Sequence, residues 1–375
     1  MTMHPGPQPN PSDRPPWDRA EFRFWVGAVS FVVILALALA IVAVAVAQPD
    51  DGGGGGRRGA PAGSAVEAFP GEEIDVSGDP GSRFEARDPD APPVPGTPAG
   101  TVHQVTLEMT EEDLEIAPGL IQRMWTFGGT VPGPVLRGKL GDVFEVTIVN
   151  KGEIQHSIDF HASKVAWNVE MRSINPGESL VYRFEATQPG IYMYHCGTPP
   201  VLHHIGNGMY GAIIIDPPDL APVDHEFVMV QSELYSAPLG EVASLEKMLA
   251  EQWDAVVFNG YPNQYVHRPI RVEPAQRIRI WVIDDGPSEN SAFHVIGTIF
   301  DTVYKEGGYR IRNGTGTGGS QALDLQPSQG GFVEFSFAVP GLYPFVTHKF
   351  ASAAKGAVGM FQAGDVELPG GSTGH

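Results

Sequence analysis

From Thr101 onward, apolar and polar residues alternate with a period of two, in short segments that end at glycine or proline. The clearest segments are VHQVTLEMT, DVFEVTIVN, SLVYRFEAT, EFVMVQSEL, RIRIWVID and GFVEFSFAV. This alternation is typical of β-strands with one face in a core, and glycine and proline are typical of the turns between strands. The pattern therefore predicts an all-β protein built from sandwiches of two sheets.

The strand pattern occurs twice. FGGTVPGPVLRGKLGDVFEVTIVN is similar to FNGYPNQYVHRPIRVEPAQRIRIWVID, and PGESLVYRFEATQPGIYMYHC is similar to SQGGFVEFSFAVPGLYPFVTH. This internal repeat predicts two related domains over residues 101–218 and 219–366, with a tail over 367–375. The matching segments lie farther apart toward the C-terminus, so the second domain carries an insertion, for which NGTGTGG at 313–319 is a candidate. One helical turn is expected near 244–252.

The N-terminal part of the chain has a different character. Residues 1–24 are polar and rich in proline, whereas residues 25–47 contain no charged side chain. A helix over 25–47 is about 34 Å long, which predicts one transmembrane anchor. A cleaved signal peptide is the alternative, because AVA precedes Gln48, but the apolar part of a signal peptide usually has only about 7–15 residues. Residues 48–100 are rich in glycine, proline and acidic side chains and predict a disordered linker.

The positive charges near the anchor predict its orientation. Three arginines precede the apolar segment and two follow it, which favours a cytoplasmic N-terminal tail. We therefore expect a single-pass protein of the cell membrane with its globular domains on the extracytoplasmic side.

Composition excludes several classes of function. The net charge is −20, without a basic stripe, which argues against nucleic acid as a partner. The chain has one cysteine, so an internal disulfide and every metal site with several cysteines are excluded.

Seven residues of the first domain can bind a metal or move a proton. They are His156, Asp159 and His161 in HSIDFHA, His195 and Cys196 in YMYHC, and then His204 and Met209. Successive side chains of a strand point to opposite faces. If Cys196 points inward with His156, then His161 and His195 point outward together, near Asp159.

The inward group gains His204 and Met209 from the turn-rich segment GTPPVLHHIGNGM. Two histidines, one cysteine and a weakly bound methionine are the ligand set of a type-1 copper site for electron transfer. The outward group has only two imidazoles, and a copper held by three imidazoles needs one more. We expect His348 to be the third ligand, because it ends the strand that matches the one that carries His195. His294 is then a nearby proton-handling group.

The string HSIDFHA, the His–Cys pair, the His-x4-Met loop and the repeated domains make the chain similar to copper-containing nitrite reductases, which belong to the two-domain multicopper oxidase superfamily. The similarity covers about residues 101–366. It implies two tandem cupredoxin domains, each a Greek-key β-sandwich, and an active homotrimer. In the family, the type-2 copper lies between domain one of one subunit and domain two of the next.

The resemblance also implies individual roles. These are type-1 copper ligands His156, Cys196, His204 and Met209, type-2 copper ligands His161, His195 and His348, a catalytic pair Asp159 and His294, and Ile296 in the substrate pocket. Each subunit would hold one copper of each type. The implied reaction is the one-electron reduction of nitrite to nitric oxide, with electrons from an external donor such as a small cytochrome or cupredoxin.

Two features depart from the family pattern. The loop from the cysteine to the next ligand is one residue shorter than in typical members, and His203 stands where a tryptophan is usual. His203 is therefore an alternative ligand to His204. We favour His204 because it keeps the five-residue step to Met209.

Two other functions stay open. One is a type-1/type-2 copper oxidoreductase that acts on another small nitrogen or oxygen species. The other is a type-1 copper electron carrier without catalysis, and whether His348→Ala abolishes turnover distinguishes it from the enzyme. A laccase-type trinuclear cluster needs paired HxH and HCH motifs, and the chain contains neither.

Overall fold

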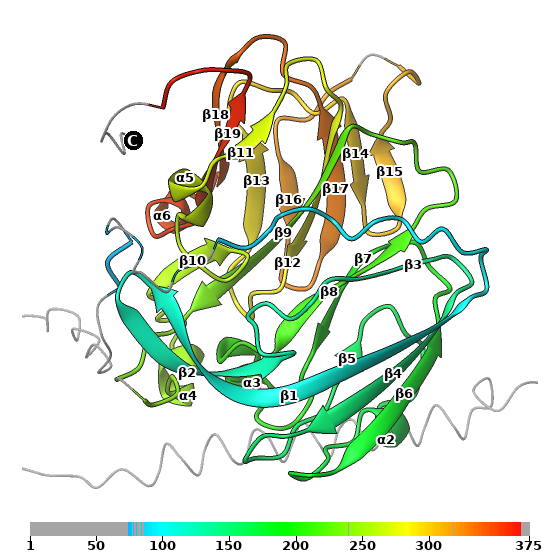
Figure 1. Cartoon of the computed structure of the whole chain (residues 1–375), viewed down its shortest axis with the longest axis vertical. Coiled ribbons are helices and arrows are strands. Elements are labelled where there is room, and N and C mark those ends of the chain that lie inside the picture. The colour runs from blue at the N-terminus through cyan, green and yellow to red at the C-terminus, as the bar shows by residue number, and fades with distance from the viewer. Residues whose placement is uncertain are drawn as a thin grey trace, which may run out of the picture. The chain divides into compact units, whose positions relative to one another are not determined.

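The computed structural model describes residues 74–76, 78, 80, 84, 86–238, 240–316 and 318–368, which are coloured in Figure 1. The predicted N-terminal tail, the predicted anchor and most of the predicted C-terminal tail lie outside these residues. Within the described part of the chain, no helix is long and apolar enough to cross a membrane.

The first half of the described chain forms two four-stranded sheets. One has the order β2-β1-β4-β6, with β1 Val102–Ala117, β2 Leu120–Phe127, β4 Val143–Asn150 and β6 Ser179–Glu185. The other has the order β3-β8-β7-β5, with β3 Leu136–Lys139, β5 Asp159–Phe160, β7 Gly190–His195 and β8 Tyr210–Asp216. Both sheets contribute to one apolar core, which includes Leu107, Phe144, Tyr182, Tyr194 and Ile213.

The second half forms a six-stranded and a five-stranded sheet. The first has the order β10-β9-β12-β17-β14-β15, with β9 His225–Leu234, β10 Ala255–Phe258, β12 Ile278–Asp284, β14 Thr302–Lys305, β15 Gly308–Ile311 and β17 Gly330–Phe335. The second has the order β11-β19-β18-β13-β16, with β11 Ile270–Val272, β13 Ser291–Val295, β16 Leu323–Leu325, β18 Gly341–Thr347 and β19 Val358–Ala363. Their shared core is rich in phenylalanine. The described chain is thus all-β, as predicted.

The two halves use the same strand pairing, which agrees with the internal repeat in the sequence. β1 pairs in parallel with β4, as β9 does with β12, and β3 pairs in parallel with β8, as β11 does with β19. β7 and β8 are antiparallel neighbours, and so are β18 and β19, which lie side by side near the red end of the colour scale in Figure 1. The second half adds β14, β15 and β16, and the candidate insertion at 313–319 lies between the last two.

The helices are short, and each has four to six residues. They are α2 Trp167–Glu170, α3 Val201–Gly206, α4 Leu245–Leu249, α5 Gln264–His267 and α6 Phe350–Ala353. α4 is the helical turn predicted near 244–252, and the Ser244 side chain caps it by accepting a hydrogen bond from the Lys247 amide.

The two halves share a further core and a buried ion network. Ile191 of β7, Trp281 of β12 and Phe332 of β17 belong to one apolar cluster. The Arg137 guanidinium of β3 pairs with Asp216 at 2.8 Å and with Glu226 of the second half at 2.9 Å. Because a buried charge is costly without a partner, these paired charges fix how β3 meets β9.

The second part of the predicted linker differs from our expectation of disorder. Residue Ala91 donates its amide to the Glu226 carbonyl at 2.8 Å, and the Pro92 carbonyl accepts from the Arg137 guanidinium at 2.7 Å. The segment from Ala86 therefore lies along both halves as an extended strap. Within the strap, only Asp90 forms a β-bridge, with Phe227. The strap is not a regular strand, so its sequence lacks the alternation of apolar and polar residues that would predict it.

Candidate metal centres

The first cluster of candidate ligands brings together three segments of the first half of the described chain. His156 precedes β5 and exchanges backbone hydrogen bonds with Ile174, Cys196 follows β7, and His204 lies in α3. The Nδ1 atom of His204 is 3.3 Å from Nδ1 of His156 and 3.3 Å from Sγ of Cys196. All three candidate ligand atoms lie within 4.8 Å of one another. We call His156, Cys196 and His204 the closed cluster.

Burial controls the protonation of the closed cluster. The side chains of His156, Cys196 and His204 are 0%, 0% and 3% exposed. Burial lowers the pKa of His156 and lowers the pKa of His204 to about 3, because a charged imidazole loses its hydration. Burial also raises the pKa of the Cys196 thiol, against hydrogen bonds from Thr198 and Ser157. Both imidazoles are therefore neutral bases at physiological pH, as a metal ligand must be.

Two neighbours of the closed cluster were candidates in the sequence. Met209 is fully buried, its amide donates to the His204 carbonyl, and its carbonyl accepts from the Cys196 amide, both at 3.1 Å. His203, the alternative to His204, is engaged elsewhere, because its Nε2 atom is 2.8 Å from the Ala243 carbonyl of the second half. Geometry thus brings His204, and not His203, to the cluster.

The second cluster, His161, His195 and Asp159, lies on the other face of β7; we call it the open cluster. Asp159 pairs with His195 across β5 and β7, and the Nε2 atoms of His161 and His195 are 3.0 Å apart. Oδ2 of Asp159 is 3.9 Å from Nε2 of His195. The Nδ1–H group of His195 donates to the Cys196 carbonyl at 2.9 Å, which leaves its Nε2 lone pair facing His161.

The two histidines of the second half form a separate pair. His294 is in β13, His348 follows β18, and their ring centres are 5.6 Å apart. The His348 amide donates to the Ala292 carbonyl at 2.7 Å, and Nδ1 of His294 contacts the Gln321 carbonyl. Among the described residues of one chain, His348 is not in the group of ligand atoms that includes His161 and His195.

Comparisons with known proteins identify the family. Residues 108–220 match a family model described as multicopper oxidase. The chain is 35% identical over 292 residues to the copper-containing nitrite reductases of Neisseria meningitidis (serogroup A) and Neisseria gonorrhoeae, and the matches cover 75% of this chain and 74% and 73% of those relatives. The chain belongs to the copper-containing nitrite reductase family.

Solved structures agree. The copper nitrite reductase from Nitrosomonas europaea has 34% identity and a TM-score of 0.65, with 71% of this chain and 95% of that chain covered. The copper-containing nitrite reductase from Thermus scotoductus SA-01 has 30% identity and a TM-score of 0.65, with 70% of this chain and 62% of that chain covered.

The donor set of this family member fits copper. The closed cluster brings one thiol and two neutral imidazoles together. The Nδ1 atoms of His156 and His204 are 3.3 Å apart, and two ring nitrogens this close need a proton or a metal between them. Soft sulfur with imidazole is a ligand set that copper favours. The open cluster offers imidazole nitrogens beside a carboxylate, which also suits copper.

The sequence did not reveal several residues around these clusters. Oε1 of Glu111 in β1 is 3.4 Å from Nε2 of His156. The Trp125 ring contacts His156, His203 and His204. In the second half, Glu289 accepts from the Trp253 indole at 3.0 Å and contacts Lys349 and Ser352 around His348. These residues lie far from the clusters in sequence, and neither their composition nor their spacing distinguishes them from surface residues.

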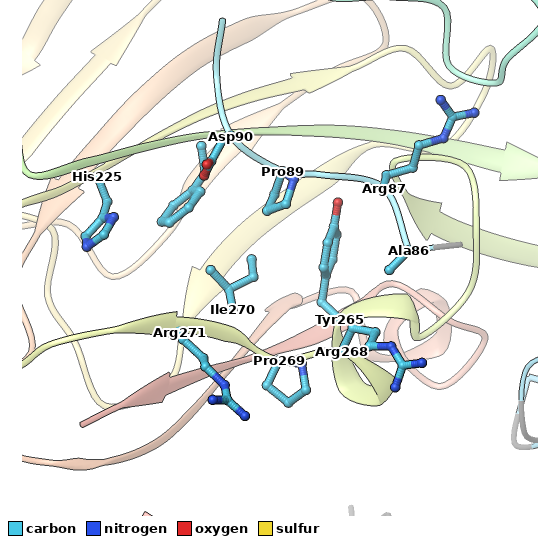
Figure 2. A pocket seen from close by; sticks show the side chains of 11 residues that line it. Ala86, Arg87, Pro89, Asp90, His225, Tyr265, Arg268, Pro269, Ile270 and Arg271 are labelled. Carbon is cyan, nitrogen blue, oxygen red and sulfur yellow. The ribbon is translucent and has the colours of Figure 1, made fainter. Parts of the chain in front are cut away.

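A cavity of about 500 Å³ lies between the strap and the second sandwich, and Figure 2 shows the residues that line it. Tyr265 and Ile270 lie at its centre, and the side chains of Arg87 and Arg271 extend away from each other. The Arg87 guanidinium donates to the Val131 carbonyl at 2.9 Å. None of the predicted site residues lines this cavity, so we do not assign it to the reaction.

Proposed function

We propose that this protein reduces nitrite to nitric oxide with copper at both clusters. Membership of the copper-containing nitrite reductase family supports this function. The observation that carries it is the arrangement at the end of β7, where the adjacent residues His195 and Cys196 belong to two different clusters of candidate ligands. Consecutive Cα atoms lie about 3.8 Å apart, so one peptide link joins the two clusters.

We assign a type-1 copper to the closed cluster, with His156, Cys196, His204 and Met209 as its ligands. A buried, rigid ligand set limits the change in geometry between the two oxidation states, which suits electron transfer. We assign a type-2 copper to the open cluster, with His161 and His195 as ligands. Each subunit then binds one copper of each type.

The third ligand of the type-2 copper is His348 of a neighbouring subunit in a homotrimer. The positions of the histidines support this assignment. Within one chain, His348 lies with His294 and not with His161 and His195. Among the described residues, the open cluster therefore has two imidazoles, and a second copy of the chain would supply the third.

Asp159 and His294 are the proposed proton donors of the reaction. Conversion of nitrite to nitric oxide and water consumes one electron and two protons. Copper bound at the open cluster would supply a Lewis-acidic position for nitrite and deliver the electron. His294 contacts the Gln321 carbonyl through Nδ1, so its Nε2 atom is the one available to hold and deliver a proton. The Asp159 carboxylate, 28% exposed, is close enough to His195 to face the same position.

Ile296 forms the apolar wall of the proposed substrate pocket. It follows His294 by two residues, its side chain is 41% exposed, and its amide donates to the Pro344 carbonyl at 2.8 Å. An exposed apolar side chain beside a small-anion site limits the size of what can bind there.

We assign different roles to the two domains and place both outside the cytoplasm. Residues 101–218 form the domain with the type-1 copper and residues 219–366 the second domain. Both are tethered to the cell membrane through the anchor at 25–47. The net charge of −20 favours a donor with a positive patch, such as a small cytochrome or cupredoxin.

The test is turnover of the copper-loaded full chain without oxygen, with a reduced dye as donor and nitrite as substrate. We expect one nitric oxide for each electron consumed, recorded with a nitric oxide electrode. Reoxidation by hydroxylamine or oxygen, without turnover of nitrite, would favour the oxidoreductase with another substrate. Reduction and reoxidation of one copper without any product would favour the electron carrier.

A further inference from the structure

His156 contacts two different groups with its two ring nitrogens. Nδ1 faces the closed cluster, 3.3 Å from Nδ1 of His204, and Nε2 faces Glu111, with 3.4 Å to Oε1. His156 is fully buried and the Glu111 side chain is 8% exposed. A neutral imidazole carries one proton, and a carboxylate accepts it best. The Nε2–H tautomer therefore satisfies Glu111 and leaves the Nδ1 lone pair for a metal.

The Glu111 carboxylate is held in place by the loop between β4 and β5. Its two oxygens accept from the Glu153 amide at 3.0 and 2.9 Å. A Cβ atom at residue 152 would lie 2.5 Å from Oε1 of Glu111, so glycine at that position lets the loop approach the carboxylate. Glu111 is thus fixed between its backbone partner and His156, unlike an acidic side chain that moves freely in solvent.

Glu111 also lies where solvent approaches the closed cluster. It lines a cavity of about 440 Å³ together with Arg123, Trp125 and Glu153. The Arg123 side chain pairs with Asp113 at 3.4 Å and approaches Glu153 at 3.9 Å. Among the described residues, no lysine or arginine side chain has an ion pair with Glu111, so its negative charge acts on the His156 ring.

We propose that Glu111 is a positioning residue for the closed cluster that fixes the tautomer of His156 and lowers the reduction potential of a copper bound there. The proposal rests on the proposed function only in taking the closed cluster as a copper site. A carboxylate that accepts from the far nitrogen of a ligating histidine orients the ring and makes it more basic. A more basic ligand and a nearby negative charge both stabilise Cu(II) more than Cu(I).

Glu111→Gln tests the proposal in the copper-loaded full chain. The glutamine keeps an oxygen for the Glu153 amide but loses the negative charge. We expect the preference for Cu(II) over Cu(I) to fall about tenfold, which is a rise of about 59 mV for a one-electron couple. The readouts are the potential of the closed-cluster copper, from a redox titration of its optical band, and its copper affinity, which we expect to fall about tenfold.

Asp113→Asn is the matched control. It removes one negative charge from the same strand, two residues away, at a side chain that is 58% exposed. We expect its potential to stay close to that of the wild type. Equal potentials in Glu111→Gln and Asp113→Asn would overturn the proposal, because the loss of any nearby negative charge would then explain the shift in potential.

Glu111→Asp keeps the charge and withdraws the carboxylate by one methylene. We expect a smaller rise of the potential in the same direction, and this variant decides the matter if Glu111→Gln does not fold. A Glu111→Asp potential equal to that of the wild type would then overturn the proposal. Failure of the copper assignment gives a different result, since the wild type itself would then show no optical band from copper bound to Cys196. Failure of nitrite turnover alone leaves that band in place and does not affect the test.

Discussion

The closed and open clusters differ in exposure although they share a strand. His195 and Cys196 are neighbours at the end of β7, yet Cys196 is fully buried with two buried imidazoles, whereas His195 faces the exposed His161. The side chains of His195 and Asp159 are 12% and 28% exposed. The closed cluster has its partners within one chain, and the open cluster has a side that one chain leaves uncovered. The pleat of one strand thus separates a site suited to hold an electron from a site suited to bind a substrate.

The largest expected effect concerns the closed cluster. Cys196→Ser removes the soft sulfur ligand and with it the optical band of a copper–thiolate bond. We expect turnover driven by a protein donor to fall to background, while the copper of the open cluster remains bound. Copper quantitation and the visible spectrum are the measurements. Retention of the band in this variant would show that another residue binds the copper.

Variants of the second half separate the ligand from the proton donor. His348→Ala should remove the type-2 copper and leave the type-1 spectrum unchanged, because His348 does not belong to the closed cluster. His294→Ala should keep both coppers and slow turnover by about 10²–10⁴-fold, the range for loss of an acid–base group. Copper content and steady-state rates distinguish the two. Loss of the type-2 copper in His294→Ala but not in His348→Ala would show that His294 is the ligand and His348 the proton donor.

Glu289 offers a smaller and more specific effect, on the segment that carries His348. It accepts from the Trp253 indole and contacts Lys349 and Ser352, so it holds the turn that carries His348. We expect Glu289→Gln to weaken type-2 copper binding by about tenfold and to leave the type-1 optical band unchanged. Competition with a chelator measures the affinity. Asp324→Asn, at a side chain that is 83% exposed, is the control and should change neither.

A further expected effect is a pH dependence of the stability of the copper-free protein. Burial lowers the pKa of His204 to about 3, against about 6.5 in the unfolded chain. Between these two pKa values the unfolded state binds more protons than the folded state. The contribution of His204 to the free energy of unfolding is therefore fully present above pH 6.5 and is lost as the pH falls toward 3. At pH 5 the free energy of unfolding is about 2 kcal/mol lower from this cause than it is above pH 6.5.

Thermal unfolding of copper-free wild type and His204→Asn at pH 8 and pH 5 measures this contribution. The wild type should lose more stability than the variant between the two values. Equal losses in both proteins would mean that His204 is not the buried neutral base that distinguishes the closed cluster.

The sequence predicted the sheets and the sorting of ligands, because strand alternation is a local property. His156 and Cys196 were expected on one face and His161 and His195 on the other, and the structure places them so. The sequence could not choose firmly between His203 and His204, since both lie in α3, and the contact of His203 with Ala243 depends on the second half. Glu111 was missed for a similar reason, because its contact with His156 depends on how β1 meets a distant loop. The strap from Ala86 was missed because an extended segment without strand pairing has no apolar period.

The central claim is that each chain binds two coppers of different character through His195 and Cys196, neighbouring residues at the end of β7. The most direct measurement is copper quantitation with electron paramagnetic resonance on the oxidised full chain, before and after addition of nitrite. We predict two coppers per chain and two signals of equal intensity, of which nitrite changes only the one that Cys196→Ser preserves. One copper per chain, or a nitrite effect on the signal that depends on Cys196, would contradict the account.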